Sequence, residues 1–150
     1  MARVQFDLPE AFIYTTDVQV YLSHVNQAGH LDNAQLLTLL SEARARFFKW
    51  LGCTEFDVGD DASIVVGDLI AQYKSEGFHG DVLRVELVPQ DFNKYGFDLV
   101  FKMSQADSGL EVARGKCGIV FVHVDTKRPT PRPATFMSRL LAQAPGLTVA

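Results

Sequence analysis

Residues 32–51 read DNAQLLTLLSEARARFFKWL, and their apolar side chains recur at the spacing of a helix. One face of that helix carries Leu36, Leu40, Ala43, Phe47 and Leu51. Asp32 is a favourable N-cap residue, and Gln35 three positions later completes an Asp-x-x-Gln capping pattern. Gly52 suits the left-handed position that ends a helix. The stretch therefore predicts one helix about 28 Å long, whose broad apolar side must lie on a flat surface.

The remaining sequence predicts strands. Residues 12–22 and 64–73 are rich in β-branched and aromatic residues, and residues 82–88 and 95–103 alternate between apolar and polar side chains. Residues 110–124 form a further long β-rich run. The order is strand, long helix, then four strands with short connections, which favours antiparallel pairing.

We therefore expect an α+β fold, in which a curved antiparallel sheet of five to six strands wraps one long central helix. Prolines follow the last strand, and residues 134–142 suit a short terminal helix. Residues 1–150 are expected to form a single domain, because 150 residues match the usual domain size.

Composition excludes several classes of function. Fourteen basic and eighteen acidic side chains leave a net charge of −4, so the chain offers no basic field to nucleic acid. No apolar run is long enough to cross a membrane, and the N-terminal segment does not resemble a signal peptide. Cys53 and Cys117 lack the spacing of a zinc site, so no metal is expected. The expected location is the cytoplasm, with both thiols reduced.

Residues 26–34, NQAGHLDNA, join the first strand to the long helix and are the segment most suited to chemistry. The start of a helix presents unpaired N–H groups and the positive end of its dipole. Gly29 just before it permits a substrate carbonyl to approach closely. Such an arrangement can polarise a carbonyl group or hold an oxyanion.

The pattern Gly29-His30-Leu31-x-Asn33, followed on the helix by Glu42-Ala43-Arg44, resembles the hot-dog-fold acyl-CoA thioesterases of the 4-hydroxybenzoyl-CoA thioesterase type. The segments 73–81 and 119–125 resemble later strands of that family in the same order, so the likeness extends over about residues 12–135. It implies the hot-dog fold and hydrolysis of an acyl-CoA or acyl-carrier-protein thioester without a cofactor. It also implies a homodimer or homotetramer, with substrate bound where two subunits meet.

One departure from the family pattern concerns catalysis. The family's catalytic aspartate stands four positions before the histidine, where this chain has Asn26. A neutral amide neither attacks a thioester nor takes a proton from water, although it can orient water or the carbonyl. Another base is then required, and Glu42 on the helix and His24 at the end of the first strand are the candidates. Ordinary explanations are an ion pair of Glu42 with Arg46 and solvation of His24.

Other residues are candidates for binding substrate. His30 matches the family histidine and suits either a substrate contact or a packed imidazole, and Asn33 matches a family asparagine. Asp32 is near enough to contact substrate but is better explained as the helix cap. The densest basic patch lies beside prolines and could hold the phosphates of coenzyme A; it consists of Lys127, Arg128 and Arg132.

Three functions fit this sequence. The first is thioester hydrolysis, with the carbonyl at the Gly29–His30 turn and the helix amides as oxyanion donors. The alternative is a non-catalytic hot-dog module that binds acyl-CoA or a related ligand, which the amide at Asn26 favours. Hydration or dehydration of acyl-CoA fits least, because those relatives carry an aspartate five residues before the histidine, where this chain has Val25.

Overall fold

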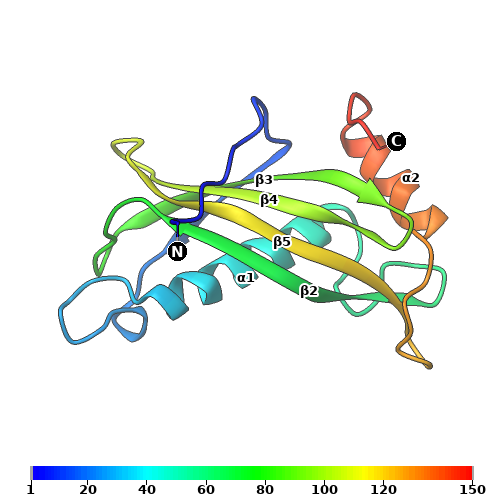
Figure 1. Ribbon diagram of the computed structural model, residues 1–150, viewed down its shortest axis with the longest axis horizontal. Coiled ribbons are helices and arrows are strands. Elements are labelled where there is room, and N and C mark those ends of the chain that lie inside the picture. Colours follow the sequence, from blue (N-terminus) through cyan, green and yellow to red (C-terminus); the bar gives the residue numbers. More distant parts are fainter. Residues whose placement is uncertain (1, 150) are drawn as a thin grey trace. The chain divides into compact units, whose positions relative to one another are not determined.

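The computed structural model describes residues 2–149 and contains five strands and two α-helices (Figure 1). In chain order the elements are β1 (Tyr14–Gln19), the 3-10 turn η1 (Leu22–His24), α1 (Asn33–Trp50), β2 (Ala62–Tyr73), β3 (Val82–Asn93), β4 (Gly96–Gln105), β5 (Glu111–His123) and α2 (Ala134–Gln143). The predicted order of strand, long helix and four strands is confirmed.

The five strands form one sheet in the order β1-β3-β4-β5-β2. β1 pairs antiparallel with β3, from Tyr14 opposite Leu87 to Gln19 opposite Val82. Tight connections join β3 to β4 and β4 to β5, as antiparallel neighbours allow. The predicted α+β class with an antiparallel sheet is confirmed, and β1 and β2 are its two outer strands.

β3 is longer than the sequence predicted, because it continues through Pro89 to Asn93. A proline interrupts a strand where its missing N–H would have paired. The pairing with β1 extends only to Leu87, so Pro89 lies beyond the stretch of β3 that β1 covers. The strand therefore tolerates proline at this position.

Contacts within the chain fall into two units. Unit 1 comprises the described residues up to Arg44 together with Ala71–Val88 and Phe101–Gly115. Unit 2 comprises Ala45–Ile70 and Pro89–Val100, and continues from Lys116 to the end of the described chain. Whether the chain is a single domain stays a prediction.

The core of unit 1 is aliphatic. Its fully or almost fully buried side chains come from the first half of α1 and from the strands, and include Leu36, Leu40, Leu83, Val85 and Met103. The alternation predicted for residues 82–88 is present, since Leu83, Val85 and Leu87 are buried while Arg84 is exposed. This packing fixes the first turns of α1, which begin at the candidate site.

The core of unit 2 is aromatic. Phe136 of α2 is fully buried, and its ring contacts the rings of Phe48, Phe97 and Phe121 at centroid distances of 5.9, 5.7 and 5.1 Å. Aromatic pairs at such distances add to the free energy gained from burial alone. The short helix α2 therefore supplies part of the core of this unit.

Neither helix in the described part of the chain is long and apolar enough to span a membrane.

We predict that Phe136→Ala lowers the free energy of unfolding by about 3–5 kcal/mol, because it leaves a cavity among three aromatic rings. The matched control is Phe56→Ala, since Phe56 is 86% exposed and its loss should change stability by less than about 0.5 kcal/mol. Urea unfolding followed by circular dichroism measures both. Equal stabilities for the two variants would contradict this account of the core.

Candidate functional site

The loop before α1 is organised around Asn26. Its side-chain Oδ1 accepts hydrogen bonds from the N–H groups of Ala28 (3.0 Å) and His30 (3.2 Å). Its backbone carbonyl accepts the N–H of Gly29 (3.0 Å). Gly29 has a φ of +82°, which glycine adopts without steric cost. Because Oδ1 is turned into the loop, the Nδ2 group of Asn26 remains as a hydrogen-bond donor.

A second loop, between β2 and β3, holds this one in place. The Leu31 N–H donates to the Gly77 carbonyl at 2.7 Å, and His30 and Phe78 form an antiparallel bridge. Leu31 is buried, and a Cβ at Gly77 would lie only 3.1 Å from the Leu31 Cβ. The close approach of the two loops therefore favours glycine at position 77.

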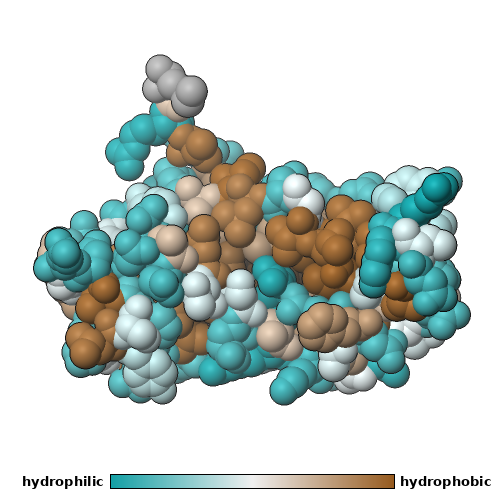
Figure 2. Space-filling view, turned by 90° about the horizontal axis from the view of Figure 1, so that it is seen from below, coloured by the Kyte–Doolittle hydropathy of each residue, from teal (hydrophilic) through white to brown (hydrophobic). Residues whose placement is uncertain are grey.

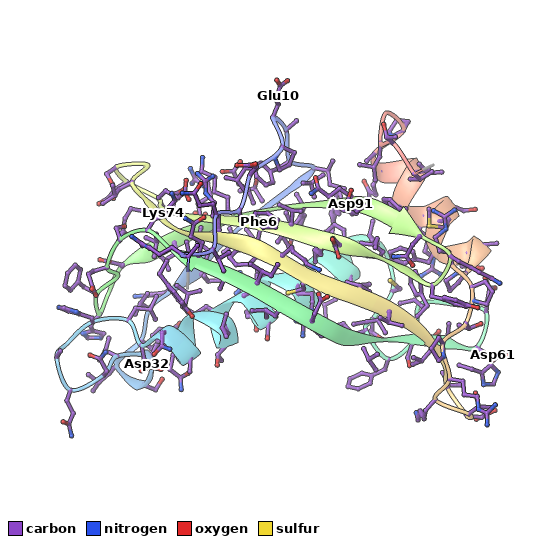
Figure 3. The ribbon with its side chains drawn as sticks, in the orientation of Figure 1. Phe6, Glu10, Asp32, Asp61, Lys74 and Asp91 are labelled. Atoms are coloured by element: carbon purple, nitrogen blue, oxygen red, sulfur yellow. The ribbon has the colours of Figure 1, made fainter. Side chains whose placement is uncertain are left out.

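Asp32 caps α1, as the sequence predicted (Figure 3). Its Oδ2 accepts the N–H groups of Ala34 (3.0 Å) and Gln35 (3.2 Å), and its carbonyl accepts the N–H of Leu36. The helix start therefore does not present the row of unpaired amides that the sequence suggested. In the part of the chain that the structure describes, the N–H of Asn33 is the amide of the first helical turn without an acceptor.

A cavity of about 230 Å³ opens where these two loops meet the beginning of α1. All the residues that line it belong to unit 1. They are Asn26, His30, Leu31, Asn33, Leu36, Tyr73, Ser75, Glu76, Gly77 and Val112. Leu31, Leu36 and Val112 give this lining its apolar side chains, and polar side chains make up most of the rest.

Two hydroxyl groups in this lining are already engaged. The Ser75 hydroxyl donates to the Glu111 carbonyl at 2.6 Å, and the Tyr73 hydroxyl donates to the Asn33 carbonyl at 3.0 Å. Burial raises the pKa of the Tyr73 phenol, and the negative charge of Asp32 raises it further. Neither hydroxyl is therefore placed as a nucleophile or base near neutral pH.

An imidazole and a carboxylate meet in the same lining. The Nδ1 atom of His30 lies 2.7 Å from Oε2 of Glu76. The side chain of His30 is 38% exposed and that of Glu76 is 60% exposed, so both remain accessible to water and to a ligand. The Phe78 ring and the imidazole pack edge to face at a centroid distance of 5.2 Å.

Three of the predicted site residues line the cavity: Asn26, His30 and Asn33. Gly29 and Asp32 belong to the loop that forms its wall and shape that loop through a turn and a cap. His24 and Glu42, the two predicted bases, are not among the lining residues.

His24 is held by a separate contact. Its Nδ1 accepts the Tyr21 N–H at 3.0 Å, and its ring stacks on the Tyr21 ring. The neutral imidazole then carries its proton on Nε2, so that nitrogen is a donor. Glu42 is exposed on α1.

The predicted basic patch belongs to unit 2. Lys127 and Arg128 are exposed in the turn that follows β5. The Arg132 guanidinium donates to the Val149 carbonyl at 2.8 Å and lies over the Phe92 ring. None of the three lines the cavity of unit 1.

Sequence reasoning missed Glu76 and Tyr73. Both lie in the segment 73–81, which the sequence marks only by its likeness to the entry of a strand. No spacing relates Glu76 to His30, which is 46 positions earlier in the sequence. The available signal for Glu76 was its position directly before Gly77. A glycine between two strands marks a loop, and binding or catalytic side chains often lie on loops.

The described residues contain no group of three or more His, Cys, Asp or Glu side chains placed to hold a metal ion.

One comparison with known proteins identifies a family. The model of the thioesterase-like superfamily matches residues 20–140. No curated protein matches the sequence.

Solved structures resemble the chain over most of its length. A 1,4-dihydroxy-2-naphthoyl-CoA thioesterase from Synechocystis, Slr0204, has a TM-score of 0.77 at 21% identity and covers 85% of this chain and 94% of its own. A thioesterase from Thermus thermophilus, solved with coenzyme A and Zn, has a TM-score of 0.76 at 21% identity, with 93% and 100% covered. SAV2348 from Staphylococcus aureus, solved with CoA, has a TM-score of 0.79 at 16% identity, with 97% and 92% covered. At these identities the likeness shows the fold.

We predict that Asp32→Ala lowers the free energy of unfolding by about 1 kcal/mol, because two N–H groups at the start of α1 lose their acceptor. Asp32→Ser is the control, since a serine hydroxyl can accept the same hydrogen bonds and should lose much less. Urea unfolding compares the two variants with the parent chain. Equal losses for alanine and serine would show that Asp32 does not act as the cap.

Proposed function

The chain belongs to the thioesterase-like superfamily and has the hot-dog fold, and we propose that it hydrolyses acyl-CoA thioesters in the cavity beside Asn26 and His30. The observation that carries this proposal is that cavity, at the start of α1, where polar groups gather beside the apolar side chains of Leu31, Leu36 and Val112. The predicted loop and helix motif borders it directly. The reaction takes water and a thioester and releases a carboxylic acid and a thiol.

Two donors at the cavity suit a thioester carbonyl. The N–H of Asn33 lies at the positive end of the α1 dipole, and the Nδ2 group of Asn26 comes from the loop that leads into α1. Hydrogen bonds from such fixed donors stabilise the negative charge that develops on the carbonyl oxygen during attack by water. Leu36 and Val112 supply apolar surface to the acyl group.

Asn26 replaces the carboxylate of the family pattern, and we propose that it positions the carbonyl or the water. The Oδ1 atom of Asn26 accepts two N–H groups of the loop, and orienting a ligand through Nδ2 requires no proton transfer. Glu42 and His24 stay as predicted bases, although neither lines the cavity.

We propose that basic residues bind the phosphates of coenzyme A. Lys127, Arg128 and Arg132 are the predicted set. A further basic pair supports phosphate binding by this chain. Arg3 and Lys74 line a cavity of about 310 Å³ that shares Tyr73 with the first cavity. Guanidinium and ammonium groups are the usual partners of phosphate.

The proposed location is the cytoplasm. Cys53 and Cys117 are buried free thiols, as is usual for proteins of a reducing compartment.

We predict that the purified protein releases thiol from at least one member of a panel of short, aromatic and long acyl-CoA substrates. A thiol reagent gives the rate continuously, and coenzyme A release should depend on protein concentration. Heat-denatured protein is the control for spontaneous hydrolysis. Absence of release across the whole panel would contradict the proposed function.

The alternative, a non-catalytic module that binds acyl-CoA, is distinguished by Asn26→Asp. Both Oδ atoms of an aspartate can accept the loop hydrogen bonds, so the fold should be kept. Activity in both proteins supports an enzyme that works with asparagine. Activity in the variant alone, with ligand binding by the parent chain, would identify the parent as a binding module.

We further propose that the protein is a homodimer or homotetramer in which β2 strands pair. β2 is an outer strand of the sheet, and Val65, Val66 and Leu69 on it are exposed. Figure 2 shows apolar side chains gathered at the surface on the face that it presents. An outer strand with unpaired backbone groups and apolar side chains is a template for pairing with a second copy.

We predict that the double variant Val65→Lys, Leu69→Lys shifts the protein towards its protomer mass of 16.6 kDa. Two ammonium groups on one face of the outer strand repel their counterparts in the partner. Leu110→Lys, at an exposed position outside β2, is the control and should keep the parent's mass. Sedimentation equilibrium measures all three, and a monomeric parent chain would refute the proposed assembly.

A further inference from the structure

We propose that His30 is the general base of the reaction and that Glu76 is its positioning residue. This inference rests on the proposed thioester hydrolysis. In place of the missing aspartate, two side chains from two loops carry out the proton transfer. The Nδ1 atom of His30 and the Oε2 atom of Glu76 lie 2.7 Å apart in the lining of the same cavity.

The contact with Glu76 fixes which imidazole nitrogen is basic. A carboxylate accepts hydrogen bonds, so the Nδ1–H of His30 donates to Oε2 of Glu76. In the neutral ring the lone pair is then on Nε2, the nitrogen that takes a proton. Neutral histidine is suited to this transfer near neutral pH.

Three further contacts position His30, two through its backbone and one through its ring. The His30 N–H donates to Asn26 Oδ1, the backbone of His30 forms a bridge with Phe78, and the Phe78 ring and the imidazole pack edge to face. A base held through both its backbone and its ring loses little freedom when substrate binds. Asn26 therefore supports the base, although it is not itself one.

Two other titratable groups near the cavity, Tyr73 and Asp32, are already engaged and do not serve as the general base. Tyr73 of β2 has a raised pKa and donates its hydroxyl to the Asn33 carbonyl. Asp32, at the cap of α1, is committed to the N–H groups of Ala34 and Gln35. Among the described residues that line the cavity, the imidazole and the Glu76 carboxylate are the remaining titratable side chains.

The step balances without a further reagent. Nε2 of His30 takes a proton from water while the water oxygen forms a bond to the thioester carbon. The Nδ1–H···carboxylate hydrogen bond stabilises the imidazolium that results. The C–S bond then breaks, the Nε2 proton passes to the leaving sulfur, and the acid and the thiol are released.

A double-mutant cycle tests the pair. We expect His30→Gln to lower kcat by about 10²–10⁴-fold and Glu76→Ala to lower it by about 10–10²-fold with little change in KM. Glu76→Asp, which keeps the carboxylate, should recover part of the loss. In the His30→Gln background, Glu76→Ala should cause no further loss, because Glu76 acts through the imidazole. Additive losses would overturn the assignment.

Glu10→Ala is the matched control, since Glu10 is an exposed glutamate in the N-terminal segment (Figure 3). It should leave kcat unchanged. Full activity of Glu76→Ala in an active parent enzyme would overturn the role of Glu76 and leave thioester hydrolysis standing.

A readout independent of activity separates this inference from the proposed function. Nitrogen-15 NMR of the neutral imidazole reports which nitrogen carries the proton. We expect the Nδ1–H tautomer of His30 in the parent chain and a shift towards Nε2–H in Glu76→Ala. The Nε2–H tautomer in the parent chain would overturn the pairing, whatever the activity of the enzyme.

Discussion

The hydrogen bond from the Leu31 N–H to the Gly77 carbonyl is the contact on which the site depends. It joins the loop before α1 to the loop between β2 and β3, two segments far apart in the sequence. The antiparallel bridge between His30 and Phe78 extends this contact by one residue in each loop. Because the loops are held at the backbone, the side chains of His30 and Glu76 meet at one edge of the cavity.

The functional consequence concerns the origin of the negative charge in the site. The resemblance implies an aspartate where this chain has Asn26, whereas the carboxylate beside His30 comes from Glu76 on the second loop. Asn26 keeps a structural task, since its Oδ1 accepts two loop N–H groups that a carboxylate could also accept. The loop conformation is therefore compatible with either residue, and the proposed chemistry depends on the Glu76 carboxylate of the neighbouring loop.

The fold followed from the sequence because its signals are local. The apolar spacing of α1, the Asp32 cap and the alternation in β3 and β4 each reflect the period of one element. The extension of β3 through Pro89 did not follow, because it depends on where the β1 pairing ends.

The candidate site was only partly predictable, because part of it depends on contacts between distant segments. Asn26, His30 and Asn33 lie in one short motif, and the cavity contains all three. Glu76 becomes visible only when two distant loops pair, which no spacing in the sequence encodes. The number of unpaired N–H groups at the start of α1 was overestimated from the sequence, because the Asp32 carboxylate accepts two of them.

The decisive experiment is a crystal structure of the protein with a non-hydrolysable ketone analogue of an acyl-CoA, in which a CH2 group separates the carbonyl carbon from the sulfur. We expect the carbonyl oxygen of the analogue to accept a hydrogen bond from the Asn33 N–H in the cavity of unit 1. We also expect a water within about 3.2 Å of His30 Nε2, on the side of the carbonyl carbon. An analogue bound away from this cavity, with His30 and Glu76 touching neither ligand nor water, would contradict the proposed mechanism.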